Sequence, residues 1–180
     1  MVTLRSRREV LGLAGSVVAS TLVGSRDVFA ARAPERKLKL YSVHTSEQLA
    51  VTYFRAGRYD VEALASVERL LRDHCSDETH AIDPLLLDQL HRLYKALGSR
   101  ESFHVVCGYR SAETNARERL LRHGVATHSL HIDGRAVDLF VPDRDLAAVR
   151  TAALGLHAGG VGYYPASGFV HLDTGPIRTW

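Results

Sequence analysis

The alternation of apolar and polar positions in the first half of the chain predicts a hairpin of strands followed by two helices. Residues 38–44 and 49–54 carry strand-forming side chains on either side of a short polar turn. Apolar side chains then recur at helical spacing after Asp60 and again after Asp83, two residues that can cap a helix. The apolar side of these helices is expected to lie in the core: Val61, Leu64, Val67, Leu70, Leu71, Leu86, Leu90, Leu93 and Leu97.

The second half of the chain predicts four strands with helices between them. Helices are expected from Ser111 to about Arg122, ended by His123-Gly124, and from Pro142-Asp143 onward. Short strands and helices mixed irregularly favour an α+β domain, in which helices flank a small antiparallel sheet. The strands are expected at residues 103–108, 136–141, 160–164 and 169–173, the last two forming a hairpin.

Two of these strands carry a polar side chain on the face turned away from their aliphatic residues. Side chains alternate across a strand, so Asp138 and His171 each share a face that the neighbouring valines and leucines do not. If the two strands are neighbours, Asp138 and His171 meet across the sheet, and His131 can fold back from the preceding loop over the same spot. Two imidazoles and one carboxylate suit zinc and leave a fourth position for water. The alternative is that Asp138 caps a local amide and both histidines are ordinary polar residues.

Charge and cysteine content change this picture little. The chain of 180 residues has a formal net charge of +3, and most of that excess lies in the first thirty residues. A nearly neutral remainder without a Lys/Arg cluster argues against nucleic acid as a partner. Cys75 and Cys107 are interpreted as small core residues, with one disulfide between them as the alternative.

The first thirty residues have the pattern of an export signal. SRREVL at residues 6–11 has the form of a twin-arginine motif, and a Gly- and Ala-rich apolar stretch follows. That stretch is too short and too weakly apolar for a comfortable membrane span, and Ala30 ends a suitable cleavage site. We expect residues 1–30 to be a signal peptide and residues 31–180 to be a periplasmic or extracellular domain without a stable membrane span. The alternative is an uncleaved membrane anchor.

The segment around His131 resembles the signature of a known peptidase family. The motif SxHxxGxAxD marks the zinc D-Ala-D-Ala carboxypeptidase and murein endopeptidase family. Residues 159–180, GGVGYYPASGFVHLDTGPIRTW, are similar to the exported branch of that family, often labelled a domain of unknown function (DUF882), which includes a bacterial endopeptidase of peptidoglycan cross-links. The residues that match the motif are Ser129, His131, Gly134, Ala136 and Asp138.

The resemblance covers nearly the whole chain after residue 30 and implies a fold, a cofactor and an activity. It implies a hedgehog/D-Ala-D-Ala peptidase-like fold and one zinc ion held by His131, Asp138 and His171. It further implies a murein endopeptidase that hydrolyses peptide cross-links between peptidoglycan stem peptides by a zinc-activated water. The alternatives are a D,D- or L,D-carboxypeptidase that trims stem peptides, and a non-catalytic zinc-containing module that binds the cell wall.

One departure from the family pattern concerns the general base. Many family members place Glu three residues, or His two residues, before the last ligand, where this chain has Gly168 and Phe169. The motif therefore assigns no base. Asp173 is one candidate, because it shares a strand face with His171; the alternative is a structural acceptor in the turn at residues 174–176.

Arg110 and Ser129 are the remaining candidates for the site. The resemblance implies that Arg110 is catalytic, binding the carboxylate of the substrate or polarising its carbonyl, which suits a planar donor fork. The alternative is a surface arginine paired with Glu113. Ser129 is expected to bind the substrate or the His131 loop, and His128 to lie on the rim. Aromatic residues that can wall the cleft, or equally serve in packing, are Tyr163, Tyr164 and Trp180.

Overall fold

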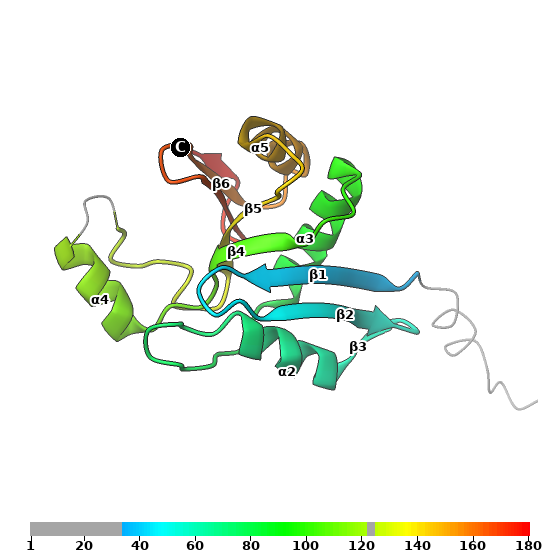
Figure 1. The fold of residues 1–180 in the computed structure, drawn as a ribbon, viewed down its shortest axis with the longest axis horizontal. Coiled ribbons are helices and arrows are strands. Elements are labelled where there is room, and N and C mark those ends of the chain that lie inside the picture. Colours follow the sequence, from blue (N-terminus) through cyan, green and yellow to red (C-terminus); the bar gives the residue numbers. More distant parts are fainter. Residues whose placement is uncertain (1–33, 122–124) are drawn as a thin grey trace, which may run out of the picture.

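The computed structural model describes residues 34–121 and 125–180, which form an eight-stranded sheet and four helices (Figure 1). The predicted signal at residues 1–30 and the helix end at His123-Gly124 lie outside these residues. In chain order the elements are β1 (Arg36–Ser42), β2 (Gln48–Arg55), β3 (Arg58–Tyr59), α2 (Val61–Leu70), α3 (Pro84–Leu97), β4 (Phe103–Cys107), α4 (Ala112–Leu121), β5 (Ala136–Phe140), α5 (Leu146–Gly155), β6 (Gly160–Tyr164), β7 (Phe169–Asp173) and β8 (Arg178–Thr179).

The sheet has the strand order β3-β2-β1-β4-β5-β7-β6-β8, and it confirms the α+β class. It is larger than the small antiparallel sheet that we expected, and it is mixed: β1 pairs with β4, and β6 with β8, in parallel. The first parallel pair arises because the chain passes through α2 and α3 between β1 and β4. Strands β3 and β8 were not predicted, since two residues are too few to show a period.

Helix caps that the sequence predicts are present at α2 and α3. The side chain of Asp60 accepts a hydrogen bond from the Ala63 amide, and Asp83 accepts one from the Leu85 amide. The helix predicted after residue 142 is present as α5, but its predicted start was wrong: the helix has Asp145 as its N-cap residue rather than starting at Pro142-Asp143. Asp143 instead accepts a hydrogen bond from the Ser99 hydroxyl at 2.7 Å, which ties the turn before α5 to the end of α3.

A single apolar core lies between one face of the sheet and the helices α2, α3 and α5. The aliphatic residues of β5 and β7 point into it, as alternation predicts, and Val137, Leu139, Val170 and Leu172 are all fully buried. Val61, expected in the core, is 79% exposed because it is the first residue of α2 and faces solvent. The opposite face of the strands is thereby left for polar side chains.

Neither cysteine is the buried core residue that we expected. Cys75 is exposed, Cys107 is half-buried, and both are free thiols. Among residues 34–121 and 125–180, no helix is long and apolar enough to cross a bilayer.

Candidate functional site

The hydrogen-bond register of the sheet aligns polar positions from neighbouring strands in one row. Cys107 of β4 pairs with Asp138 of β5, Asp138 pairs with His171 of β7, and His171 pairs with Gly162 of β6. Residues directly opposite one another on paired strands project from the same face. Asp138 and His171 therefore meet across the sheet, on the face turned away from the core, as strand parity predicts.

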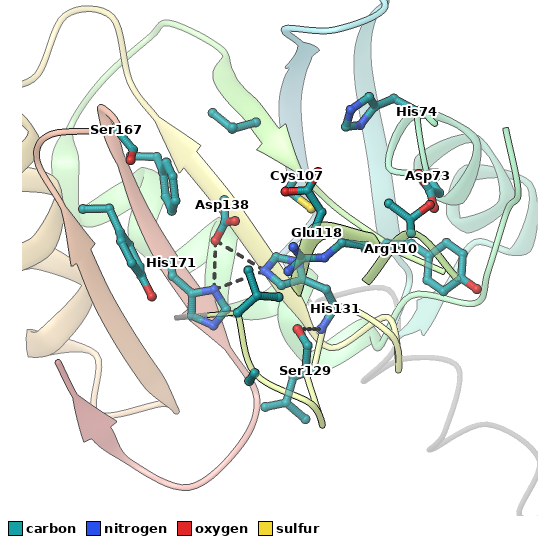
Figure 2. Close-up of a pocket in the computed structure, with 18 of the residues that line it drawn as sticks. Asp73, His74, Cys107, Arg110, Glu118, Ser129, His131, Asp138, Ser167 and His171 are labelled. Carbon is teal, nitrogen blue, oxygen red and sulfur yellow. Dashed lines mark hydrogen bonds and ion pairs between the residues drawn. The ribbon is translucent and has the colours of Figure 1, made fainter. Parts of the chain in front are cut away.

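His131 completes a compact group of three potential metal ligands (Figure 2). Its Nε2 atom lies 3.2 Å from His171 Nδ1 and 3.4 Å from Asp138 Oδ1, and the last two atoms are 2.8 Å apart. Four-coordinate zinc with bonds of about 2.0–2.1 Å to nitrogen and oxygen sets its ligand atoms about 3.3 Å apart. The three atoms thus form a triangle of the size that one zinc ion needs.

Hydrogen bonds on the far side of each ring determine which nitrogen faces this triangle. His131 Nδ1 lies 2.7 Å from the Gly108 carbonyl, and His171 Nε2 lies 3.0 Å from Asp173 Oδ2. A carbonyl and a carboxylate can only accept, so both of these nitrogens carry the proton and donate. In the neutral rings the lone pairs of His131 Nε2 and His171 Nδ1 then point towards the Asp138 carboxylate. These two lone pairs and the negative carboxylate repel one another unless a cation lies between them. The arrangement therefore fits a divalent metal ion.

The electrostatics of the group also favour positive charge. Burial raises the pKa of Asp138, but its attraction and hydrogen bonds to His131 and His171 outweigh burial and hold that pKa well below its usual range. Burial likewise opposes a charge on His131, yet attraction to Cys107 and Asp138 leaves the pKa of His131 well above its ordinary value. The pocket is therefore built to hold a cation, either a proton or a metal ion.

Asp173 is fully buried, and its carboxylate is occupied by hydrogen-bond donors. It accepts hydrogen bonds from the amides of Gly160 (3.1 Å) and Gly175 (2.8 Å), from the Arg178 guanidinium (2.7 Å) and from His171. Burial raises the pKa of Asp173, but the hydrogen bonds from these donors outweigh burial and hold that pKa far below its usual range. These contacts favour the second of the two roles considered for Asp173, a structural acceptor in the turn at residues 174–176.

A pocket of about 570 Å³ opens beside the three candidate ligands. Ser129 lies at its edge, where its hydroxyl accepts a hydrogen bond of 3.3 Å from the His131 amide. Tyr164 and Trp180 line the pocket, whereas Tyr163 packs against the Arg150 guanidinium instead. Other lining residues include His44, His74, Cys75, Cys107, His128 and Phe169.

Arg110 also lines this pocket, directly after β4 and before α4. Its side chain extends towards His131, and its buried Nε has no hydrogen-bond partner in the described part of the chain (Figure 2). The alternative partner, Glu113, is exposed in the first turn of α4. The structure therefore places a guanidinium beside the candidate ligands.

Several contacts of the site could not be predicted from the sequence alone, although Trp180 itself was predicted as a residue that can wall the cleft. Arg178 secures Asp173, and the Trp180 indole lies 5.3 Å from the His171 ring while it packs on Gly162. The positions of Arg178 and Trp180 depend on the pairing of β8 with β6. That pairing could not be predicted, because β8 has only two residues. Across the pocket, His44 and His74 stack with ring centroids 3.8 Å apart, a contact between segments thirty residues apart.

The loop that carries His131 requires a glycine at position 134. The φ of Gly134 is +65°, and a Cβ there would lie 2.1 Å from the Ala81 carbonyl oxygen, which is backbone and cannot move aside. We expect Gly134→Ala to lower the free energy of unfolding by about 3 kcal/mol, through left-handed strain and overpacking, and to displace His131. The matched control is Gly168→Ala, because Gly168 also has a positive φ, +76°, but an added Cβ would have no atom within 4 Å. Chemical denaturation is expected to show a loss of about 1 kcal/mol in the free energy of unfolding of this variant. Equal losses in the two variants would contradict this account.

Comparisons with known proteins match nearly the whole chain. A peptidase family model described as peptidoglycan L,D-endopeptidase MepK matches residues 30–180. The peptidoglycan L,D-endopeptidase MepK of Escherichia coli K12 is 39% identical over 176 residues, or 97% of each chain. The probable peptidoglycan L,D-endopeptidase MepK of Haemophilus influenzae is 35% identical over 178 residues, covering 98% of this chain and 96% of its own. No solved structure gives a significant match.

Proposed function

Because the chain belongs to the MepK family of peptidoglycan L,D-endopeptidases, we propose that it hydrolyses peptide cross-links of peptidoglycan at a single zinc ion. The observation that carries the proposal is the triangle of His131, Asp138 and His171, with both ring tautomers set so that the free nitrogens face the carboxylate. These three residues would hold the metal, which supplies the Lewis acidity that activates water and polarises a carbonyl.

The other residues of the pocket have supporting roles in this proposal. Asp173 orients His171 and maintains its tautomer, with Arg178 holding the carboxylate in place. Ser129 fixes the turn that carries His131. Arg110 donates to the scissile carbonyl oxygen or to a carboxylate of the substrate, because a guanidinium fork suits both acceptors. We assign the general base to none of them, since Asp173 is already saturated with donors.

The shape of the pocket favours an endopeptidase over a carboxypeptidase. Its lining comes from both sides of the metal ligands: His44 and His74 near β1 and α2, and Tyr164 and Trp180 from β6 and the segment after β8. A substrate that extends on both sides of the scissile bond can use both rims, whereas a single terminal residue cannot.

The location of the substrate agrees with the predicted export. Peptidoglycan lies outside the inner membrane, and we propose that residues 1–30 direct the chain there by the twin-arginine route. Residues 31–180 would then be the mature zinc peptidase in the periplasm.

The proposed activity is tested with the mature chain and purified cross-linked muropeptides. Zinc-loaded protein is expected to convert L,D-cross-linked dimers into monomers, followed by chromatography and mass spectrometry. Release of single amino acids without monomers would show a carboxypeptidase. Stoichiometric zinc binding without hydrolysis of any wall peptide would show a binding module.

Arg110→Ala is expected to lower kcat by about 10²- to 10³-fold, the cost of removing one donor to a developing oxyanion. Zinc content is expected to stay at one per chain, because Arg110 is not one of the three ligands. Arg117→Ala on α4 is the control, since Arg117 is exposed and does not line the pocket. Similar activities of the two variants would remove Arg110 from the reaction.

A further inference from the structure

A bulge in β4 places Cys107 in the row of proposed metal ligands. Val105 pairs with Leu139, so regular antiparallel pairing would set Val106 opposite Asp138. The register shifts between Val105 and Cys107, and Cys107 is the residue that pairs with Asp138. Bulges often re-aim a side chain beside an active site. Here the bulge turns the Cys107 thiol towards the polar face, where Val106 also lines the pocket.

The Cys107 sulfur lies within reach of a metal ion held by the neighbouring residues. The sulfur and the ligand atoms of His131 and Asp138 all lie within 4.8 Å of one another (Figure 2). Tetrahedral zinc, with a bond of about 2.3 Å to sulfur and about 2.0–2.1 Å to nitrogen, sets these two atoms about 3.6 Å apart. The sulfur contacts the Gly108 carbonyl at 3.7 Å and also interacts with the His131 ring. The sulfur thus lies close enough to two of the proposed ligands to approach the metal that they would hold.

A second cluster of potential metal ligands lies in the same pocket, but one of its members is already occupied by hydrogen bonds. Asp73, His74 and Cys75 also bring potential ligand atoms within 4.8 Å of one another. However, the two carboxylate oxygens of Asp73 already accept the amides of Cys75 and Ser111, at 2.9 and 3.0 Å. Cys75 therefore serves as the natural control for Cys107: it is a second thiol in the same pocket, outside the row of ligands.

Resting on the metal site proposed above, we propose that Cys107 is a fourth, reversible metal ligand that closes the site when no substrate is bound. Cys107 gives its thiol proton to solvent and binds the metal as thiolate; when it leaves, the thiol takes up a proton again, and nothing is oxidised or reduced. Four protein ligands close a zinc site, whereas catalysis needs one open position. Cys107 would therefore compete with water and substrate for that position.

The test titrates Co²⁺ into metal-free mature protein and records its absorption. Wild type and Cys75→Ser are expected to bind one cobalt ion with an intense sulfur-to-cobalt band in the near ultraviolet, and Cys107→Ser to bind it without that band. In Cys75→Ser, bound metal should slow alkylation of Cys107 by iodoacetamide, because the free thiolate is the reactive nucleophile and a metal-bound sulfur is not free. Zinc-loaded Cys107→Ser is expected to hydrolyse cross-linked dimers severalfold faster than wild type.

Each other outcome contradicts a specific part of the proposal. The same cobalt spectrum in wild type and Cys107→Ser would overturn thiolate ligation and leave the site of His131, Asp138 and His171 intact. A sulfur-to-cobalt band that disappears in Cys75→Ser and survives in Cys107→Ser would assign the thiolate to Cys75. That result would also overturn ligation by Cys107. Failure of wild type to bind cobalt or zinc would overturn both this proposal and the metal site. A slower Cys107→Ser enzyme would refute the closing role.

Discussion

His131→Ala is expected to abolish hydrolysis of cross-linked muropeptides, with a loss on the order of a thousandfold or more. Removal of one of the three proposed ligands would loosen the metal. The Lewis acidity of a catalytic metal contributes several kcal/mol of transition-state stabilisation, at about 1.4 kcal/mol per factor of ten in rate. Chelation of the wild-type enzyme should produce a comparable loss, reversed when zinc is restored. The measurements are the rate of monomer release and the zinc content per chain by elemental analysis.

Stability must be separated from chemistry in this variant. His131 is 2% exposed and donates to the Gly108 carbonyl, so its loss also leaves a cavity and an unpaired acceptor, at a cost of about 2–4 kcal/mol. The chelated wild type retains the imidazole and is free of this effect. His128→Ala is the matched control, because His128 is exposed on the rim of the same loop. Hydrolysis that persists without metal would falsify the mechanism.

Asp173→Asn is expected to lower zinc affinity by about 10- to 100-fold, the range found when a group that orients a metal-bound histidine is lost. The carboxylate receives His171 Nε2–H, two amides and Arg178 at the same time. An amide group offers one oxygen where the carboxylate offers two, so it cannot accept from all of them, and His171 loses its fixed tautomer. Metal competition with a coloured chelator measures the affinity. Chemical denaturation is expected to show a loss of about 1–3 kcal/mol, the cost of leaving a buried hydrogen-bond donor without its acceptor.

Asp133→Asn provides the comparison for Asp173. Asp133 lies two residues from His131 but is exposed, so its charge is screened and both zinc affinity and stability should change little. A general base would lose turnover at full metal occupancy, whereas an orienting residue loses metal first. Unchanged zinc affinity in Asp173→Asn, together with a large fall in kcat, would therefore restore Asp173 as the candidate base.

The sequence was most informative where structure depends on neighbouring residues. Alternation along β5 and β7 placed Asp138 and His171 on the face away from the core, because the period of two is a property of each strand alone. The caps of α2 and α3 are equally local, since each joins a side chain to an amide two or three residues ahead. The predicted start of α5 was wrong because Asp143 accepts a hydrogen bond from Ser99, which lies 44 residues away in the chain.

By itself the sequence determined the α+β class, the family and the three candidate ligands, because strand parity and a short motif contain that information. Only the tertiary structure decided the surroundings of those ligands. The donors around Asp173, the indole of Trp180 on Gly162 and the shifted register that turns Cys107 towards Asp138 all arise from pairing between distant strands. Such contacts depend on how strands lie against one another, and a one-residue shift in register exchanges the two faces of a strand.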